Sequence, residues 1–217
     1  MLLGVMNAAK AQNSLHILVG NSTSMSKWSA IPTGFDAISS LSANNVYIGV
    51  GWEMKIKGNF YFEPQMALHQ KGNHFLYTTS GLKTAVNSIQ VNLRYSCLEV
   101  PLLLKHKVEQ KKIIYYTSLG VAPAYMLRGE GTFINQFIGG DNPFYQKESK
   151  TFSVDGYNRF DLSALAGFGV EYSITPNMAL NLDVRAFYGL LKFIKKETIG
   201  SQNFMGVTSN IGIIRKF

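Results

Sequence analysis

The stretch that decides the fold is the last one in the chain, Val207-Thr208-Ser209-Asn210-Ile211-Gly212-Ile213-Ile214-Arg215-Lys216-Phe217. Val207, Ile211 and Ile213 fall on one side of a two-residue period. Thr208 and Asn210 fall on the other side. Because successive side chains of a β-strand point to opposite faces, this stretch predicts an amphipathic strand that ends in an aromatic residue.

Seven further segments alternate in the same way and also predict strands. They cover residues 14–22, 46–56, 59–70, 89–106, 113–127, 160–174 and 178–190. Within residues 89–106 the apolar positions are odd-numbered up to Tyr95 and even-numbered from Leu98 onward. We expect a β-bulge near Ser96 and Cys97 to restore a common facing.

Composition narrows the fold class. The chain has 217 residues, of which 46% are hydrophobic and only 16% are charged, against a usual ~25%. No run approaches the roughly 18 consecutive apolar residues of a membrane-spanning helix. The net charge of +8 forms no dense cluster, so we expect no nucleic-acid partner. The basic residues fall near predicted strand ends, which suits the phosphates of outer-membrane lipid.

The connections between the predicted strands alternate between short and long. Residues 57–58, 107–112 and 175–177 form the short ones, and residues 23–45, 71–88, 128–159 and 191–203 form the long ones. Tight periplasmic turns and longer outer loops are typical of outer-membrane barrels. The pattern therefore predicts an all-β fold, an eight-stranded antiparallel up-and-down transmembrane β-barrel with both termini in the periplasm. A soluble lipocalin-like carrier is the alternative, and it requires an apolar interior.

Aromatic residues fall near both ends of the predicted strands, as the two interfacial belts of a membrane barrel require. The expected belt at the short-turn end comprises Phe60, Phe62, Tyr115, Tyr172 and Phe217. The expected belt at the long-loop end comprises Tyr95, Tyr125, Phe160 and Tyr188.

The face opposite the apolar rows predicts a polar network inside the barrel. Its expected members are Glu53, Glu63, Gln65, His69, Arg94, Glu99, Glu171, Asn181, Asp183 and Arg185. An eight-stranded barrel is just wide enough for side chains to fill, and buried charges must pair. We therefore expect a structural network, neutralised by Arg185, Arg94 or Lys55.

No motif in the sequence assigns an enzymatic activity. The four histidines lack metal-ligand spacing, and no Gly-x-Ser-x-Gly is present. We assign no catalytic residue, no metal and no cofactor, and we expect a non-enzymatic protein. An envelope lipid-modifying barrel enzyme, with His69 in a hydrolase triad, is the alternative.

The segment 128–159 is the candidate partner loop, because it carries more apolar surface than a solvated loop needs. Phe133, Phe137, Phe144 and Tyr145 lie in it. The segment either covers the barrel mouth as a lid or contacts a partner.

The N-terminal residues 1–11 resemble the remnant of a secretory signal peptide. Residues 1–6 are apolar, and Ala9-Lys10-Ala11 precedes Gln12 like a cleavage site. We expect residues 12–217 to form a single barrel domain. The alternative is the N-terminal segment of a cytosolic protein.

Five elements of the sequence together resemble the PorT-like outer-membrane β-barrels of the Bacteroidota. They are LEVPLLLK at residues 98–105, the strand containing Gly120 and ending Ala124-Tyr125, GFGVEY at 167–172, LNLDVR at 180–185, and Tyr188-Gly189-Leu190. The resemblance implies an OmpX-like or PorT-like eight-stranded barrel in the bacterial outer membrane. It also implies a structural or interaction role, as an accessory to protein secretion or surface attachment, with other envelope or secretion proteins as partners.

Overall fold

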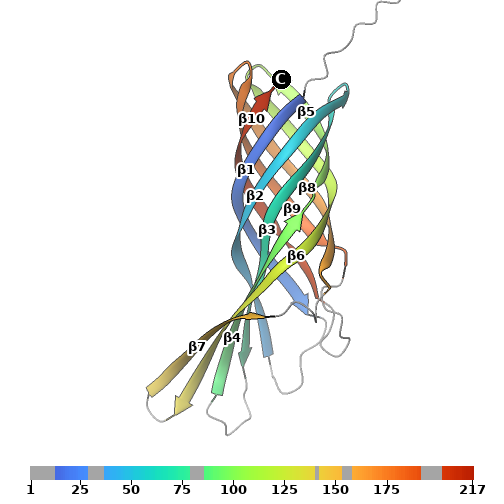
Figure 1. The fold of residues 1–217 in the computed structure, drawn as a ribbon. Helices are drawn as coiled ribbons and strands as arrows, with labels where there is room; N and C mark the ends of the chain where they lie inside the picture. The colour runs from blue at the N-terminus through green and yellow to red at the C-terminus, as the bar shows by residue number, and fades with distance from the viewer. Residues whose placement is uncertain (1–12, 29–36, 79–85, 140–141, 153–157, 192–201) are drawn as a thin grey trace, which may run out of the picture.

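The computed structural model describes residues 13–28, 37–78, 86–139, 142–152, 158–191 and 202–217 (Figure 1). They form ten strands, β1 (Asn13–Trp28), β2 (Ala37–Lys57), β3 (Phe60–Thr78), β4 (Val86–Glu99), β5 (Leu102–Gln110), β6 (Ile113–Gly139), β7 (Asn142–Phe152), β8 (Phe160–Thr175), β9 (Met178–Gly189) and β10 (Gln202–Lys216). The described residues include no helix with the length and apolarity that a membrane crossing needs. The predicted signal remnant at 1–11 lies outside the described residues.

Nine of these strands close into a cylinder, and β7 pairs with β6 outside the ring. All the pairings are antiparallel. β4 and β5 share one position in the wall, because each pairs with β3 on one side and with β6 on the other. The chain stays in the wall between them, since Val100 N–H donates to Pro123 O at 2.9 Å. The cylinder therefore has eight wall positions, which confirms the predicted eight-stranded barrel.

The final strand closes the barrel against the first. β10 pairs with β1 along its whole length, from Ser14 opposite Lys216 to Trp28 opposite Gln202. Phe217 N–H continues the seam by donating to Asn13 O at 3.0 Å. The quoted C-terminal stretch thus has both neighbours of a wall strand, β1 and β9.

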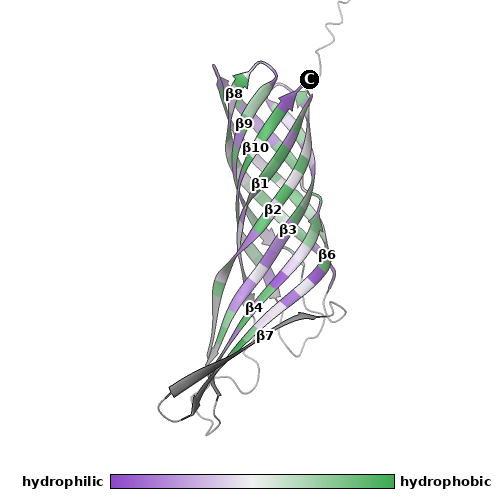
Figure 2. Cartoon of the chain, turned by 60° about the vertical axis from the view of Figure 1, so that its left-hand side comes forward, coloured by the Kyte–Doolittle hydropathy of each residue, from purple (hydrophilic) through white to green (hydrophobic). Residues whose placement is uncertain are grey.

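Apolar side chains face outward and ionic side chains face inward. Leu182 is 59% exposed, whereas its neighbour Asp183 is 1% exposed. The same alternation appears along the wall in Figure 2, where hydrophobic and hydrophilic bands succeed each other on each strand. An apolar exterior around a polar interior is the opposite of a lipocalin-like carrier, so the structure contradicts that alternative.

The predicted phase slip in residues 89–106 is wrong. Val91, Tyr95 and Cys97 are buried like Glu99, so the inward face stays odd-numbered throughout. Tyr95 and Cys97 point inward because they join an apolar layer inside the barrel with Leu103, Met126, Leu165, Phe187 and Phe204.

The bulge instead places its extra residue on the neighbouring strand β6. Ser96 pairs with Arg128 and Cys97 pairs with Met126, which leaves Leu127 as the extra residue. Leu127 and Arg128 are both exposed, and the inward face of β6 changes from Met126 to Gly129.

The aromatic belts form as predicted with two differences. Tyr95 is 0% exposed and packs edge-on against Phe204, with 5.5 Å between ring centroids. Phe62 is half-buried. The other seven predicted belt residues are exposed, namely Phe60, Tyr115, Tyr125, Phe160, Tyr172, Tyr188 and Phe217. Phe217 also stacks on Trp52 at 5.6 Å.

The long connections are shorter than predicted because the strands continue past the barrel. β6 runs to Gly139 and returns as β7, with Gly139 opposite Asn142. Figure 1 shows this hairpin and the neighbouring ends of β4, β3 and β2 leaving the cylinder on the side opposite the C-terminus. We call the paired segments 37–42, 73–78, 86–93, 129–139 and 142–152 the projecting sheet. Of the two alternatives for residues 128–159, the lid over the barrel mouth does not fit the described part of the segment, which extends away from the barrel.

Candidate functional site: a filled polar interior and an open polar cavity

The interior near the short-turn end holds three carboxylates bridged by two lysines. Lys107 Nζ lies 2.6 Å from both Glu53 Oε1 and Glu171 Oε1. Lys105 Nζ contacts Glu63 and lies 3.5 Å from Glu53 Oε2. All five side chains are buried. The bridging satisfies the requirement that buried charges be paired.

A histidine adjoins the same carboxylates. His16 Nδ1 lies 3.4 Å from Glu63 Oε1, and His16 Nε2 lies 3.0 Å from Ser14 Oγ. His16, Glu53 and Glu63 together have the spacing of metal ligands. The two lysine ammonium groups already neutralise both carboxylates, so we assign no metal to this group.

The middle of the barrel is held by a hydrogen-bonded group around Arg185. Its Nε lies 2.7 Å from Asp183 Oδ1, and its Nη1 donates to Gln65 Oε1 at 2.7 Å. Tyr116 donates to Asp183 Oδ2 at 2.9 Å, and Tyr47 donates to Gln65 Oε1 at 3.1 Å. These contacts connect β2, β3, β6 and β9 across the cylinder.

The third interior group has the connectivity of a hydrolase triad. Ser22 Oγ lies 2.7 Å from His69 Nε2, and His69 Nδ1 lies 2.7 Å from Glu99 Oε2. Ser22 is 0% exposed, and the cavity beside His69 has a volume of about 10 Å³. That volume holds about one water molecule and is too small for an acyl chain. Lys71 also approaches Glu99, with Nζ 3.4 Å from Oε2.

Lys71 extends this group to β8. Its Nζ lies 3.0 Å from Asp161 Oδ2 and donates to Ser163 Oγ at 3.3 Å. The apolar layer around Tyr95 and Phe204 adjoins Lys71, since Tyr95 pairs with Lys71 and the Lys71 ammonium lies 5.3 Å from the centre of the Phe187 ring. The described part of the interior is thus filled with side chains from the short turns to the projecting sheet.

Nine of the ten predicted interior residues lie buried in the cylinder, and Arg94 does not. Glu53, Glu63, Gln65, His69, Glu99, Glu171, Asn181, Asp183 and Arg185 are the buried nine. Arg94 is exposed because the inward face of β4 is odd-numbered. Lys55 is also exposed and approaches the Tyr61 ring at 5.8 Å, so it does not neutralise the network.

The cations that do pair with the interior carboxylates, Lys71, Lys105 and Lys107, were not predicted from the sequence. Lys105 and Lys107 follow the parity of Glu99 and alternate with outward Leu104. The two-residue period of the strand was therefore sufficient to predict that Lys105 and Lys107 point into the barrel.

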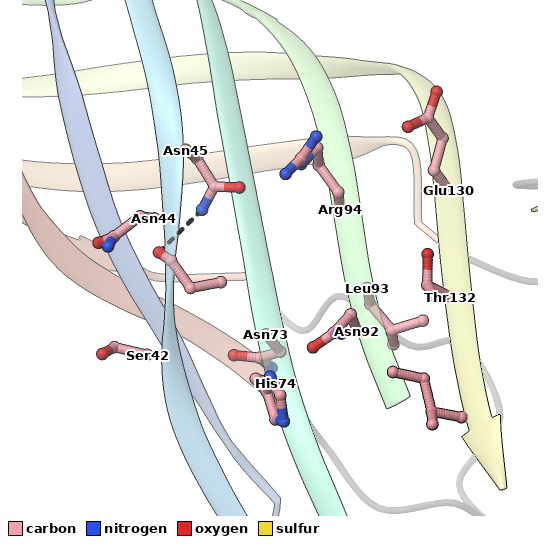
Figure 3. Close-up of a pocket in the computed structure, with 12 residues that line it drawn as sticks. Ser42, Asn44, Asn45, Asn73, His74, Asn92, Leu93, Arg94, Glu130 and Thr132 are labelled. Carbon is pink, nitrogen blue, oxygen red and sulfur yellow. Dashed lines mark hydrogen bonds between the residues drawn. The ribbon is translucent and has the colours of Figure 1, made fainter. Parts of the chain in front are cut away.

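An open polar cavity of about 420 Å³ lies at the base of the projecting sheet. It is lined by Ser42, Ala43, Asn44, Asn45, Asn73, His74, Asn92, Leu93, Arg94, Glu130, Thr132 and Ile134. Figure 3 shows these side chains on four strands, β2, β3, β4 and β6, with Arg94 pointing from β4 toward Asn45. Most of the lining is amide, hydroxyl or charged.

The predicted partner residues lie on the β6–β7 hairpin. The backbones of Phe137 and Phe144 are paired, and Tyr145 pairs with Gln136. Phe133 is half-buried. The side chains of Phe137, Phe144 and Tyr145 lie outside the described side chains.

A closed antiparallel cylinder with an apolar outer wall and a paired ionic interior defines a transmembrane β-barrel, because closure leaves no unpaired wall edge in lipid. A family model described as "Outer membrane protein beta-barrel domain" matches residues 10–195. The chain belongs to that family, and its location is the bacterial outer membrane.

The chain is also similar, at low identity, to solved structures of outer-membrane proteins. OprG from Pseudomonas aeruginosa is 13% identical with a TM-score of 0.47, and the match covers 95% of this chain and 96% of that one. Neisserial surface protein A is 12% identical, with a TM-score of 0.45 and coverage of 94% and 97%. The attachment invasion locus protein Ail of Yersinia pestis is 12% identical, with a TM-score of 0.42 and coverage of 95% and 99%. No curated protein sequence matches the chain.

Proposed function

We propose that this barrel is a non-enzymatic interaction protein that contacts its partner through the β6–β7 hairpin. The observation that carries the proposal is the contrast between the two halves of the molecule. Buried, paired side chains occupy the described interior, where the cavity beside His69 has a volume of about 10 Å³, whereas β6 and β7 extend past the barrel on the side opposite the C-terminus (Figure 1).

The hairpin suits a partner contact for two physical reasons. Among the described strands β7 pairs only with β6, so its other edge has free backbone donors and acceptors. Its sequence also carries Phe137, Phe144 and Tyr145, and aromatic residues are enriched at interface centres. The resemblance to PorT-like barrels of the Bacteroidota supports an envelope or secretion protein as the partner. If the role of the protein is surface attachment, the same hairpin is the proposed contact site.

A truncation of the hairpin tests the proposal. Replacing residues 130–151 with Asn-Gly joins Gly129 to Phe152, which are opposite each other in the ladder. We expect the truncated barrel to fold, since its eight wall positions are intact, and to lose the proteins that co-purify with the intact chain from native membranes.

The matched control replaces the turn Lys111-Lys112 with Asn-Gly at the other end of the barrel. Lys111 has a φ of 55°, which Asn tolerates. This control is expected to keep the co-purifying proteins. Retention of the same proteins by the hairpin truncation would contradict the proposal.

The lipid-modifying enzyme is the second candidate, because Ser22, His69 and Glu99 are connected like a triad. A fluorophosphonate probe labels an activated serine covalently, and we expect no labelling of the folded barrel because Ser22 is buried. Labelling that disappears in Ser22→Ala and in His69→Gln would favour the enzyme.

A further inference from the structure

The polar cavity begins where the lipid-facing surface ends. Val46 on β2 and Leu127 on β6 are exposed apolar residues. Two residues beyond Val46 lies Asn44, and three residues beyond Leu127 lies Glu130, both of which line the cavity. A ligand in the cavity therefore lies at the level of the polar headgroups, just outside the hydrocarbon.

Several polar groups in the cavity have no partner among the described residues. Arg94, His74 and Asn92 make no hydrogen bond or ion pair there, although all three line the cavity. Asn73 is 0% exposed, and its Oδ1 accepts no hydrogen bond. Buried polar atoms normally have partners, so the unpaired Asn73 oxygen points to a ligand.

The charge in the cavity favours an acid. Glu130 is held by Arg128, whose Nη2 lies 3.0 Å from Glu130 Oε1. Arg94 lies opposite Glu130 in the ladder but makes no ion pair with it. The guanidinium of Arg94 is therefore free to bind a phosphate or carboxylate with two parallel hydrogen bonds.

The amides favour a ligand with many hydroxyl groups. Asn45, Asn73 and Asn92 come from three neighbouring strands (Figure 3). The amide nitrogens of Asn45 and Asn73 already donate within the protein, so these two residues offer their oxygens as acceptors, whereas Asn92 offers a donor and an acceptor. Adjacent sugar hydroxyls also both donate and accept. We propose that this cavity binds an anionic saccharide, with Arg94 on its phosphate or carboxylate and the asparagine amides on its hydroxyls. The inference is independent of the partner contact proposed for the hairpin.

Two sources supply this chemistry, the headgroup of a glycolipid in the outer leaflet and a soluble acidic saccharide. The test reconstitutes the full chain in phosphatidylcholine bilayers and measures binding of three probes. Rough lipopolysaccharide added to the bilayer represents the glycolipid, trigalacturonate represents the soluble acid, and maltotriose is the uncharged comparison. We expect one or both acids to bind and maltotriose to bind far more weakly.

Two arginine variants distinguish the cavity from general surface charge. We expect Arg94→Gln to weaken binding of the acid by about tenfold or more, because it removes a charge-assisted pair of hydrogen bonds. Arg128→Gln is measured in a Glu130→Gln background, because Arg128 is paired with Glu130 and its loss alone would free that carboxylate beside Arg94. It removes an equal charge close by, from a residue that is not in the cavity lining, and is expected to change binding less than about threefold.

Each result decides the inference. Binding of lipopolysaccharide alone identifies the glycolipid as the source, and binding of trigalacturonate identifies a soluble saccharide. The proposal is overturned by three results: neither acid binds, maltotriose binds as well as the acids, or both arginine variants weaken binding equally. The melting temperature without ligand is expected to be the same for Arg94→Gln and the parent, since Arg94 is exposed and unpaired.

Discussion

At the scale of single residues, the interior cations determine whether the barrel tolerates its carboxylates. Six buried acids, Glu53, Glu63, Glu99, Asp161, Glu171 and Asp183, share four buried bases, Lys71, Lys105, Lys107 and Arg185, so single bases such as Lys71 and Lys107 each contact two acids. A buried charge left without its partner is costly. Removal of any one of these bases is therefore expected to destabilise the barrel, because it leaves a buried carboxylate unpaired.

Lys107 is the sharpest test of this idea, because its ammonium bridges Glu53 and Glu171. We expect Lys107→Met to lower the free energy of unfolding by about 3–5 kcal/mol, as removal of one partner of a buried pair does. Urea unfolding of the barrel refolded in detergent measures the change. Lys55→Met is the control, since Lys55 is exposed at the end of β2, and is expected to have little effect. Equal losses in the two variants would contradict the assigned pairing.

Alternation in the sequence predicted nine interior residues, and it failed at Arg94 for a physical reason. Alternation assigns residues to the interior only when one face of the strand is clearly apolar. Near Tyr95 both faces of β4 carry apolar residues, so either face could be the one that meets lipid. Tyr95 and Cys97 are apolar but point inward, because the barrel has its own apolar layer at that height. Only the packing of Phe187 and Phe204 from other strands creates that layer, and no local pattern reports it.

At the scale of elements, the position of a residue along β9 indicates its depth in the membrane. Leu182 is mid-strand and 59% exposed, whereas Met178 begins the strand at the short-turn end and is 43% exposed. We expect Leu182→Arg to destabilise the barrel in bilayers by about 2–4 kcal/mol and Met178→Arg by about 0–1 kcal/mol, as lipid-facing arginines do with depth. Reversible unfolding in vesicles compares them. A larger loss at Met178 would contradict the assigned membrane position.

The bulge in β6 makes a second prediction at this scale. Leu127 and Arg128 are consecutive exposed residues, so deleting Leu127 restores regular alternation on both sides of the deletion. Deleting Leu119 instead turns one part of β6 inside out, because a one-residue slip exchanges the two faces. We expect the Leu127 deletion to form a folded barrel, seen as a gel mobility that changes on heating. We expect the Leu119 deletion to form no folded barrel, so that its gel mobility does not change on heating. The bulge was predicted on the wrong strand, since its phase change is visible only when β6 is paired with β4.

At the scale of the whole molecule, the sequence predicted the barrel and missed the projecting sheet. Period-two alternation is strong where one face meets lipid and the other meets the ionic interior, as in β9 and β10. In segments such as 73–78 and 129–139 one face is still buried, but buried positions such as Asn73 and Gly131 do not carry apolar side chains, so the alternation in the sequence weakens. These segments become strands because the backbone pairing continues from the adjoining barrel wall, with Phe75 opposite Val91 and Val91 opposite Phe133.

Closure of the cylinder depends on the seam between the first and last strands, where Gly212 lies opposite Leu18. A Cβ at Gly212 would lie 2.5 Å from both Ile17 O and Leu18 Cδ2. The Ile17 oxygen belongs to the backbone, so it cannot move without opening the β1–β10 ladder. Glycine is therefore required at this position for close approach of the two strands.

We expect Gly212→Val to prevent closure in a large fraction of molecules, because inserting a branched side chain there overpacks the seam by about 1–3 kcal/mol or more. The measurement is the fraction of reconstituted protein that migrates as a compact band before boiling and shifts after boiling. Ile213→Val is the control on the same strand, since Ile213 is half exposed on the outer wall and loses only one methylene. A Gly212→Val barrel that closes as completely as the control would show that the seam is looser than the contacts around Gly212 imply.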